Sequence, residues 1–422
     1  MATGAHKTYE IRCPVYGFIT LNDWEWQIIS QPAYQRLRRI RQLAWTDYVF
    51  PGAMHTRFEH SLGVMHMATM LYDGVMERSR DILQAAGYNE DDLKRHKALV
   101  RLTALLHDVG HAPFSHAAEE LMTIRDPDAG DRYQHEHYSA NIVRRCFGDV
   151  IENHPLNRNC GFSAEDVANL LEDKPEAGEA LFWRDLITGQ LDADRMDYLL
   201  RDSLHCGVSY GRYDWQRLVH TIVAVPPTVE GGPRIGVMEG GWHAAEGLIV
   251  ARYFMFTQVY FHKTRVIYDH HLQNALSALL PGGHFPPPTG EALDEYLRWD
   301  DWRVLGLLAG GDGGEHGRRL SSRDHFREVT HTPESPSSED LARLNDWRTA
   351  LGDLLAAEIP AEKSWYKMGS ADVQVLADTP TSEAKPLSTY SSIVRSTPPI
   401  EQVRLYVRPE HRADAVARLQ NS

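Results

Sequence analysis

One stretch of the chain decides its fold class: residues 97–116 read KALVRLTALLHDVGHAPFSH. The first eleven of these residues place apolar side chains at helical spacing, which predicts a buried helix ending near His107. Gly110 and Pro113 then break the helical pattern, and three histidines lie between residues 107 and 116. A buried helix that runs into a histidine-rich turn favours a mainly α protein with a chemical site at the helix end.

Helical periodicity dominates the chain as far as residue 280. The segments that carry it most clearly are 58–77, 243–262 and 265–280. The last segment is followed by Pro281-Gly282-Gly283, which ends a helix. We therefore expect residues 1–280 to form one helical catalytic domain. A small β-hairpin of residues 222–229 and 234–237 is expected within it.

Residues 281–422 carry a weaker and more mixed pattern. Glycine-rich and Pro/Ser-rich stretches interrupt it at 310–314 and 332–340. The helices and strands expected here are 291–309, 340–357, 373–376 and 403–407. The predicted fold class is thus mainly α, with a helical core and a smaller mixed α/β C-terminal region. That region is expected to serve assembly, to cover the site as a lid, or to select the substrate.

Composition narrows the class of function. The chain has 422 residues, with 44 Lys and Arg against 58 Asp and Glu, so its formal net charge is −14. Such a surface repels nucleic-acid backbones, although a local basic pocket for a small anion stays open. We find no apolar run long enough for a membrane span and no apolar signal segment at the start. The four cysteines are scattered, without a CxxC pair, and a reducing cytoplasm is the expected location.

The adjacent pair His107 and Asp108 is the first candidate for a metal site. The break at Gly110 allows both side chains to lean toward one ion at the helix end. A mixture of nitrogen and oxygen ligands suits Mn, Fe, Co, Ni or Zn better than Ca. Because two ligands leave the site incomplete, His60 and Asp194 are the natural additions. A lone His-Asp pair is more often a surface hydrogen bond or a helix cap, so the metal hypothesis depends on the full set.

The set His60, His107-Asp108 and Asp194 resembles the H…HD…D signature of the HD-domain metal-dependent phosphohydrolases. Longer strings resemble the deoxynucleoside triphosphate triphosphohydrolases, which include the enzymes with SAM and HD domains. These strings are YQRLR (34–38), QL (42–43), YVFPGA (48–53), RFEHSLGV (57–64) and HDVGHAPFSH (107–116). The resemblance covers about residues 13–280. No SAM domain is expected, because the chain starts almost directly at the catalytic region.

The resemblance implies hydrolysis of a deoxynucleoside triphosphate (dNTP) to a deoxynucleoside and tripolyphosphate. Water would attack the α-phosphorus, and the metal would polarise the phosphate oxygens. Asp108 would bridge to a second ion, expected to be Mg. The departing 5′ oxygen needs a proton, and His116 is the expected general acid. Around the reacting phosphate the resemblance places His111, Glu119 and His135, supported by Glu136.

The resemblance also implies a set of substrate-binding residues: Gln42, Leu43, Arg57, Arg195, Tyr198, Asp202, Arg252, Tyr260 and Lys263. The four cations would neutralise phosphate charge in the transition state. Tyr198 and Tyr260 would pack on the sugar and exclude a 2′-hydroxyl, which predicts a preference for deoxyribose. Gln42 and Leu43 would face the base and the 3′ side of the sugar, and Asp202 would accept a hydrogen bond from the 3′-hydroxyl.

Some positions depart from the family members that are activated by nucleotides. Arg12-Cys13 stands where those members have an Asn-Asp pair, and Ser30 stands where they have an Asp that reads guanine. Residues 238–243, MEGGWH, replace a basic stretch. Activation by guanine nucleotides of that type is therefore not expected, although a homo-oligomer (dimer or higher) is.

Two other functions stay open at this point. The chain could be an HD phosphohydrolase that acts on a nucleoside mono- or diphosphate, a cyclic nucleotide or a modified nucleotide. It could also be a nucleotide- or nucleic-acid-binding protein with a vestigial HD site. The presence of all four candidate metal ligands, together with the net charge of −14, disfavours the second alternative.

Overall fold

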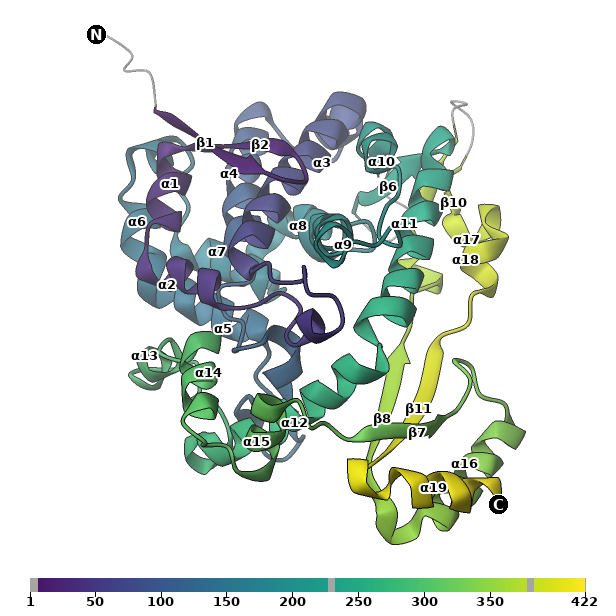
Figure 1. Cartoon of the computed structure of the whole chain (residues 1–422). Coiled ribbons are helices and arrows are strands. Elements are labelled where there is room, and N and C mark those ends of the chain that lie inside the picture. The colour runs from purple at the N-terminus through teal and green to yellow at the C-terminus, as the bar shows by residue number, and fades with distance from the viewer. Residues whose placement is uncertain (1–6, 227–231, 378–382, 422) are drawn as a thin grey trace.

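The computed structural model describes residues 7–226, 232–377 and 383–421. It confirms a mainly α fold with a helical core and a mixed C-terminal region (Figure 1). One continuous hydrophobic core extends through the helices and into the C-terminal region. None of the helices in the described ranges combines the length and the apolar character that crossing a membrane requires.

The centre of the core is helix α3 (Arg57–Ala85), which packs against α4 (Glu90–Leu106), α8 (Leu181–Thr188) and α9 (Ala193–Cys206). Each of the helices that carry the site has a polar N-cap. The Asn89 side chain accepts backbone N–H groups at the start of α4. Carboxylate side chains accept backbone N–H groups at the starts of α3 and α9. Around this centre lie α1 (Asp23–Ile29), α2 (Pro32–Gln35), α5 (His135–Ile142), α6 (Gly148–Glu152), α7 (Ala164–Leu171) and α10 (Trp215–Thr221).

The helix expected over 243–262 is interrupted. Helix α11 (Trp242–Met255) passes into a π-helical turn, Phe256–Tyr260, before α12 (Lys263–Leu279) begins in a new direction. Such π turns are frequent at functional sites. Figure 1 shows α11 and α12 between the helical core and the C-terminal sheet.

Two further helix predictions were wrong in their extent. The segment 291–309 forms two helices, α13 (Ala292–Tyr296) and α14 (Asp301–Ala309), because the Asp300 side chain caps a new start by accepting the Arg303 N–H at 2.9 Å. The segment 340–357 forms α16 (Ser338–Leu351) and then leaves the helix at Gly352, whose φ of 49° is in the left-handed region.

The C-terminal sheet has the strand order β7–β11–β8, with both pairs antiparallel. Its strands are β7 (Arg327–His331), β8 (Leu355–Lys363) and β11 (Ile400–Val407). Helices α16 and α19 (Arg412–Gln420) enclose a second small core with this sheet, formed by Leu344, Leu351, Leu354, Leu405, Val407 and Ala415. Only part of β11 was predicted from the sequence.

The predicted hairpin is present as β5 (Ile222–Val225) and β6 (Arg234–Met238), which pair antiparallel. The part of the prediction on residues 227–231 lies outside the described residues. The predicted strand near 373–376 is β9 (Gln374–Leu376), which pairs parallel to β6 and antiparallel to β10 (Lys385–Pro386). Among the strands that were not predicted are β7, β8 and the N-terminal pair β1 (Thr8–Cys13) and β2 (Gly17–Asn22).

A group of three histidines joins α12 to α15 (Gly314–Ser322) and to the chain just before β7. His271 Nε2 accepts the Phe326 backbone N–H at 3.2 Å, and its Nδ1 lies 2.8 Å from His316 Nδ1. The proton of the neutral His271 ring is therefore on Nδ1, where it is donated to His316. Burial and the neighbouring His316 lower the pKa of His271 to about 2, which keeps the ring neutral. Although His270 completes a possible metal triad, these contacts identify a hydrogen-bonded packing cluster.

Candidate active site

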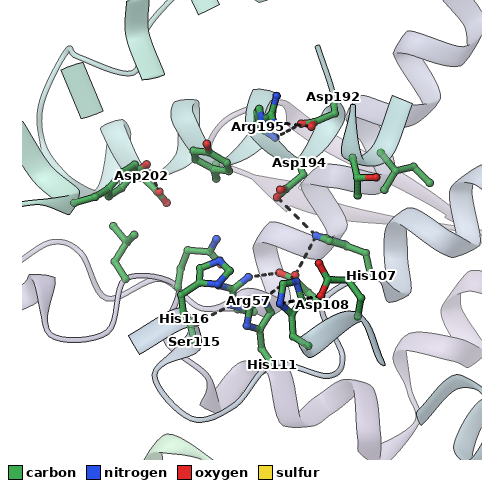
Figure 2. A pocket seen from close by; sticks show the side chains of 18 of the residues that line it. Arg57, His107, Asp108, His111, Ser115, His116, Asp192, Asp194, Arg195 and Asp202 are labelled. Carbon is green, nitrogen blue, oxygen red and sulfur yellow. Dashed lines mark hydrogen bonds and ion pairs between the residues drawn. The ribbon is translucent and has the colours of Figure 1, made fainter. Parts of the chain in front are cut away.

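Four side chains from three helices meet at one point, and Figure 2 shows three of them, His107, Asp108 and Asp194. His60 comes from the first turn of α3, His107 and Asp108 from the end of α4, and Asp194 from the first turn of α9. The His60 Nε2 atom lies 3.0 Å from Asp194 Oδ1 and 3.5 Å from Asp108 Oδ2. His107 Nε2 lies 3.2 Å from Asp108 Oδ1 and 3.8 Å from Asp194 Oδ1. The structure thus brings the four expected metal ligands together.

The helix ends explain why these segments converge. The Glu59 carboxylate accepts the backbone N–H of Thr56 at 2.9 Å and so fixes the start of α3. The Asp192 carboxylate accepts the backbone N–H of Arg195 at 2.7 Å and fixes the start of α9. These caps place the first turns of both helices, and with them two of the four ligands, at the end of α4.

The histidine rings present the correct nitrogen for a metal. His60 Nδ1 lies 2.8 Å from Asp197 Oδ2, and His107 Nδ1 lies 2.7 Å from the carbonyl oxygen of Ala104. Each Nδ1–H is donated to an oxygen, so Nε2 is the nitrogen of each ring that faces the shared centre and is placed to bind a metal. His107 Nε2 is buried and has no hydrogen-bond partner among the described residues. This donor set fits a divalent transition-metal ion.

Electrostatics at this centre favour a cation. Although burial alone would raise the pKa of Asp108, the charges of Arg57 and His107 hold it well below its usual range. Burial would lower the pKa of His60, but hydrogen bonds to Asp194 and Asp197 raise it to about 10. The carboxylates that stabilise a protonated ring in this way would equally stabilise a divalent ion.

Asp197 supports the metal site from behind, a role that the sequence did not reveal. Its carboxylate contacts the His60 ring and forms a buried ion pair with Arg201 at 2.8 Å, one turn along α9. We expect Asp197→Asn to weaken Mn²⁺ affinity by about 10- to 100-fold, because His60 loses its charged partner. Titration calorimetry with Mn²⁺ measures this change.

The matched control for that variant is Asp269→Asn. Asp269 forms the same kind of ion pair with Arg265, one turn apart on α12, and makes no ion pair with the four ligands within the described ranges. The control is expected to retain the Mn²⁺ affinity of the unmodified protein even if its thermal stability falls. Equal Mn²⁺ affinities for both variants would contradict the supporting role of Asp197.

A second group lies beside the metal ligands and contains His111, His116, Glu119 and His135. Glu119 joins two of them: its Oε1 lies 2.6 Å from His135 Nδ1, and its Oε2 lies 2.9 Å from His116 Nδ1. The His111 ring stacks on His135 with centroids 3.9 Å apart, and its Nε2 lies 3.2 Å from Asp108 Oδ1.

Burial and neighbouring charges shift the pKa values of two histidines in this group, His111 and His135, in opposite directions. Burial and the charges of Arg57 and His135 hold the pKa of His111 well below its usual value, so this ring stays neutral. Burial would also lower the pKa of His135, but Glu119 and Glu136 raise it to about 9. The Glu119 carboxylate stays ionised and orients His116 through Nδ1, which leaves His116 Nε2 for another partner.

The turn that carries His116 is strained. Phe114 and Ser115 both have φ near +60°, which is rare for residues other than glycine. Ser115 Oγ accepts the Arg57 Nε–H at 2.7 Å, and Asp301 Oδ1 accepts the Phe114 backbone N–H at 2.7 Å. Strain of this kind persists where the surrounding contacts require it, and it concentrates at functional sites.

These groups line one wall of a cavity of about 560 Å³. From the expected catalytic set, His111, His116, His135 and Glu136 line it. Glu119 lies behind this lining and hydrogen-bonds to two of its residues, His116 and His135. From the expected substrate set, the lining includes Gln42, Leu43, Arg57, Arg195, Tyr198, Asp202, Arg252 and Tyr260.

Asp202 is fixed at one end of the cavity. Its Oδ2 accepts the Tyr260 hydroxyl at 2.6 Å, and its Oδ1 lies 2.7 Å from His55 Nε2. Tyr198 meets Tyr260 edge to face, with centroids 6.2 Å apart. An aspartate held from two sides, by His55 and Tyr260, next to two tyrosines is suited to recognise a sugar hydroxyl.

The structure does not bring Lys263 to the cavity, which corrects the sequence-based prediction. The π-helical turn redirects the chain, so Lys263 begins α12 on the opposite side, and its ammonium lies 3.9 Å from Glu328 of β7. Lys363, from the end of β8, lines the cavity instead. Arg184 and Arg265, which sequence reasoning also missed, are further lining cations.

Comparison with known proteins agrees with this geometry. The family model described as the HD domain matches residues 57–202, and the model described as the HD associated region matches residues 213–396. The chain is therefore an HD-domain protein. In this HD protein the matched domain contains all four metal-ligand candidates. The domain boundary expected at residue 280 stays a prediction.

The relatives fall into two groups, uncharacterised proteins and proteins named as deoxynucleoside triphosphate triphosphohydrolases. An uncharacterised protein of Bacillus subtilis is 36% identical over 250 residues, which are 59% of this chain and 51% of the relative. A Dictyostelium discoideum protein, named as a deoxynucleoside triphosphate triphosphohydrolase SAMHD1 homologue, is 31% identical over 49% of this chain and 38% of its own length. The chain spans about half the length of the first curated relatives it matches, 51% and 49%.

A solved structure resembles nearly the whole HD protein. It is that of a hypothetical protein from Aquifex aeolicus, with a TM-score of 0.79 and 29% sequence identity. The match covers 98% of this chain and 100% of the other. The arrangement of helical core and C-terminal region is therefore shared by both proteins.

Proposed function

We propose that this HD protein hydrolyses deoxynucleoside triphosphates to a deoxynucleoside and tripolyphosphate, in a metal-dependent reaction. The observation that carries the proposal is the convergence of three features on one cavity. These are the His₂Asp₂ ligand set, the His116–Glu119–His135 relay, and the arginines that line the same space. The relatives named as dNTP triphosphohydrolases support it.

The metal ligands and the relay have separate tasks. A divalent ion, when bound, supplies Lewis-acid polarisation of the phosphate and lowers the pKa of a water molecule; Mg is proposed as a second ion. Arg57, Arg195 and Arg252 neutralise phosphate charge as it develops. His116 donates a proton from Nε2 to the departing 5′ oxygen, while Glu119 holds its Nδ1–H and stabilises the ring.

The sugar end accounts for the proposed preference for deoxyribose. Asp202 is positioned to accept the 3′-hydroxyl, because each carboxylate oxygen has lone pairs beyond those used by Tyr260 and His55. Tyr198 and Tyr260 occupy the adjacent wall, where a 2′-hydroxyl would meet apolar ring faces. We also propose that the protein forms a homo-oligomer and acts in the cytoplasm.

A second candidate function is hydrolysis of a different nucleotide. One observation favours it: the cavity continues along α7 and α8 to Leu170, Ile187 and Arg184, which the resemblance does not assign. A modified or otherwise substituted phosphate chain could extend into that space. The complete ligand set argues against a vestigial, purely binding site.

Product analysis separates these candidates. The protein is incubated with Mn²⁺ or Mg²⁺ and each dNTP, and the products are resolved by ion-pair chromatography. Tripolyphosphate with deoxynucleoside in equal amounts is the expected result. Release of orthophosphate or pyrophosphate would instead support the second candidate, and saturable binding without turnover of any nucleotide would contradict an enzymatic function.

A further inference from the structure

Lys363 is the one residue of the C-terminal sheet that lines the catalytic cavity. It is the last residue of β8, where it pairs with Ile400 of β11. Within the described ranges, no carboxylate lies at ion-pair distance from its ammonium, and its recorded contact is with the Phe256 ring, at 5.1 Å from the centroid. A cation that faces a cavity without a carboxylate partner indicates an anionic ligand.

The segment that carries Lys363 is anchored to the helical core. Arg252 Nη1 donates to the carbonyl oxygen of Trp365 at 2.7 Å, and the Trp365 ring meets Tyr253 and Phe256 edge to face, with centroids 5.0 and 5.7 Å apart. The Trp365 indole N–H donates to the carbonyl oxygen of Pro398 at 2.7 Å. These contacts hold the strand end beside α11 and the π-helical turn.

The surroundings of Lys363 are already positive. Burial and the charges of Arg252 and Arg195 lower the pKa of Lys363, so the three cations repel one another until an anion joins them. Arg252 Nε is buried and has no hydrogen-bond partner within the described part of the chain. The Lys363 ammonium and the Arg252 Nε–H thus offer to one space two donors that have no hydrogen-bond partner among the described residues, which fits a polyphosphate, whose charges are spaced along a chain.

We propose that Lys363 binds the polyphosphate chain of the substrate together with Arg195 and Arg252, so that the C-terminal region completes the active site. This inference rests on the proposed function as a nucleotide hydrolase and deepens it. It gives the C-terminal region a defined task, which is to favour nucleotides with a long phosphate chain over monophosphates. Lysine suits this task because its ammonium is a compact charge on a flexible stem.

The direct test uses inorganic tripolyphosphate as the probe, with affinity measured by titration calorimetry on the full-length protein. Lys363→Met is expected to weaken binding by about 10- to 100-fold, the usual effect of losing one charged hydrogen bond. Lys263→Met is the matched control, because Lys263 is a lysine outside the cavity; its affinity is expected to match that of the unmodified protein. Metal content is expected to be unchanged in both variants.

Kinetics with a dNTP give a second readout. The KM of Lys363→Met should rise by a similar factor, about 10- to 100-fold, while kcat changes far less. Lys363→Arg should recover most of the affinity, because it restores the charge. If Lys363→Met does not fold, Lys363→Gln, which keeps a polar side chain at the strand end, replaces it in both assays.

The outcomes separate this inference from the proposed function. Unchanged tripolyphosphate affinity and KM in Lys363→Met would overturn the inference, even if dNTP hydrolysis is observed. Weakened tripolyphosphate binding in that variant, in a protein that hydrolyses no dNTP, would uphold the role of Lys363 and reject the proposed reaction. A loss of affinity that Lys263→Met reproduces would also overturn the inference.

Discussion

Replacement of His107 by alanine is expected to remove the bound metal and the phosphohydrolase activity together, with the helices intact. His107 Nε2 has no hydrogen-bond partner among the described residues, so the hydrogen bond that the variant loses is the one from Nδ1 to the Ala104 carbonyl oxygen, within the last turn of α4. The ring supplies one of only two nitrogen ligands. Because a metal ion contributes several kcal/mol of transition-state stabilisation, turnover should fall by more than about 10³-fold.

Metal content by mass spectrometry, turnover and circular dichroism test this prediction on one preparation. His96→Ala is the matched control, because His96 is a buried histidine on the same helix α4. The control should retain both metal and activity. Metal content equal to that of the unmodified protein in both His107→Ala and Asp194→Ala would contradict the ligand assignment.

The second large effect is expected for His116→Ala, which should keep the metal and lower kcat by about 10²- to 10⁴-fold. His116 lines the cavity, and its Nδ1 is held by Glu119 at 2.9 Å, so the ring is positioned to deliver a proton from Nε2. Alanine removes that proton donor without touching the four ligands.

His331→Ala is the control for the His116 variant. His331 forms an equivalent pair with Glu328, three residues away at 2.6 Å, on strand β7 and outside the cavity lining. Steady-state kinetics should show an unchanged kcat for this control. A kcat for His116→Ala within twofold of the unmodified protein would remove His116 from the role of general acid.

The position of the His107-Asp108 pair could be predicted from local signals, which are the apolar run that ends at His107 and the break at Gly110. His60 and Asp194 were assigned because two ligands leave a metal site incomplete and because the four residues resemble the HD signature. The supporting contact of Asp197 with His60 joins residues 137 positions apart. A contact between such distant residues has no local signature, so Asp197 could not be assigned this role.

Strand β8 was not predicted, for a local reason, and Lys363 at its end was therefore not expected at the cavity. Pro360 lies inside β8 and reads as a strand breaker, yet β8 is the edge strand of its sheet, where a proline is tolerated. Without β8, nothing in the sequence placed Lys363 near the cavity. Lys263 was expected there because the family resemblance implied it, and the π-helical turn that precedes α12 has no signature in the helical periodicity of the sequence.

The most direct test of the account is crystallography of the protein soaked in Mn²⁺, with data collected at the manganese absorption edge. The account predicts an anomalous peak within about 2.3 Å of nitrogen or oxygen atoms of His60, His107, Asp108 and Asp194. A peak at the His271 and His316 cluster, with none between those four side chains, would contradict it.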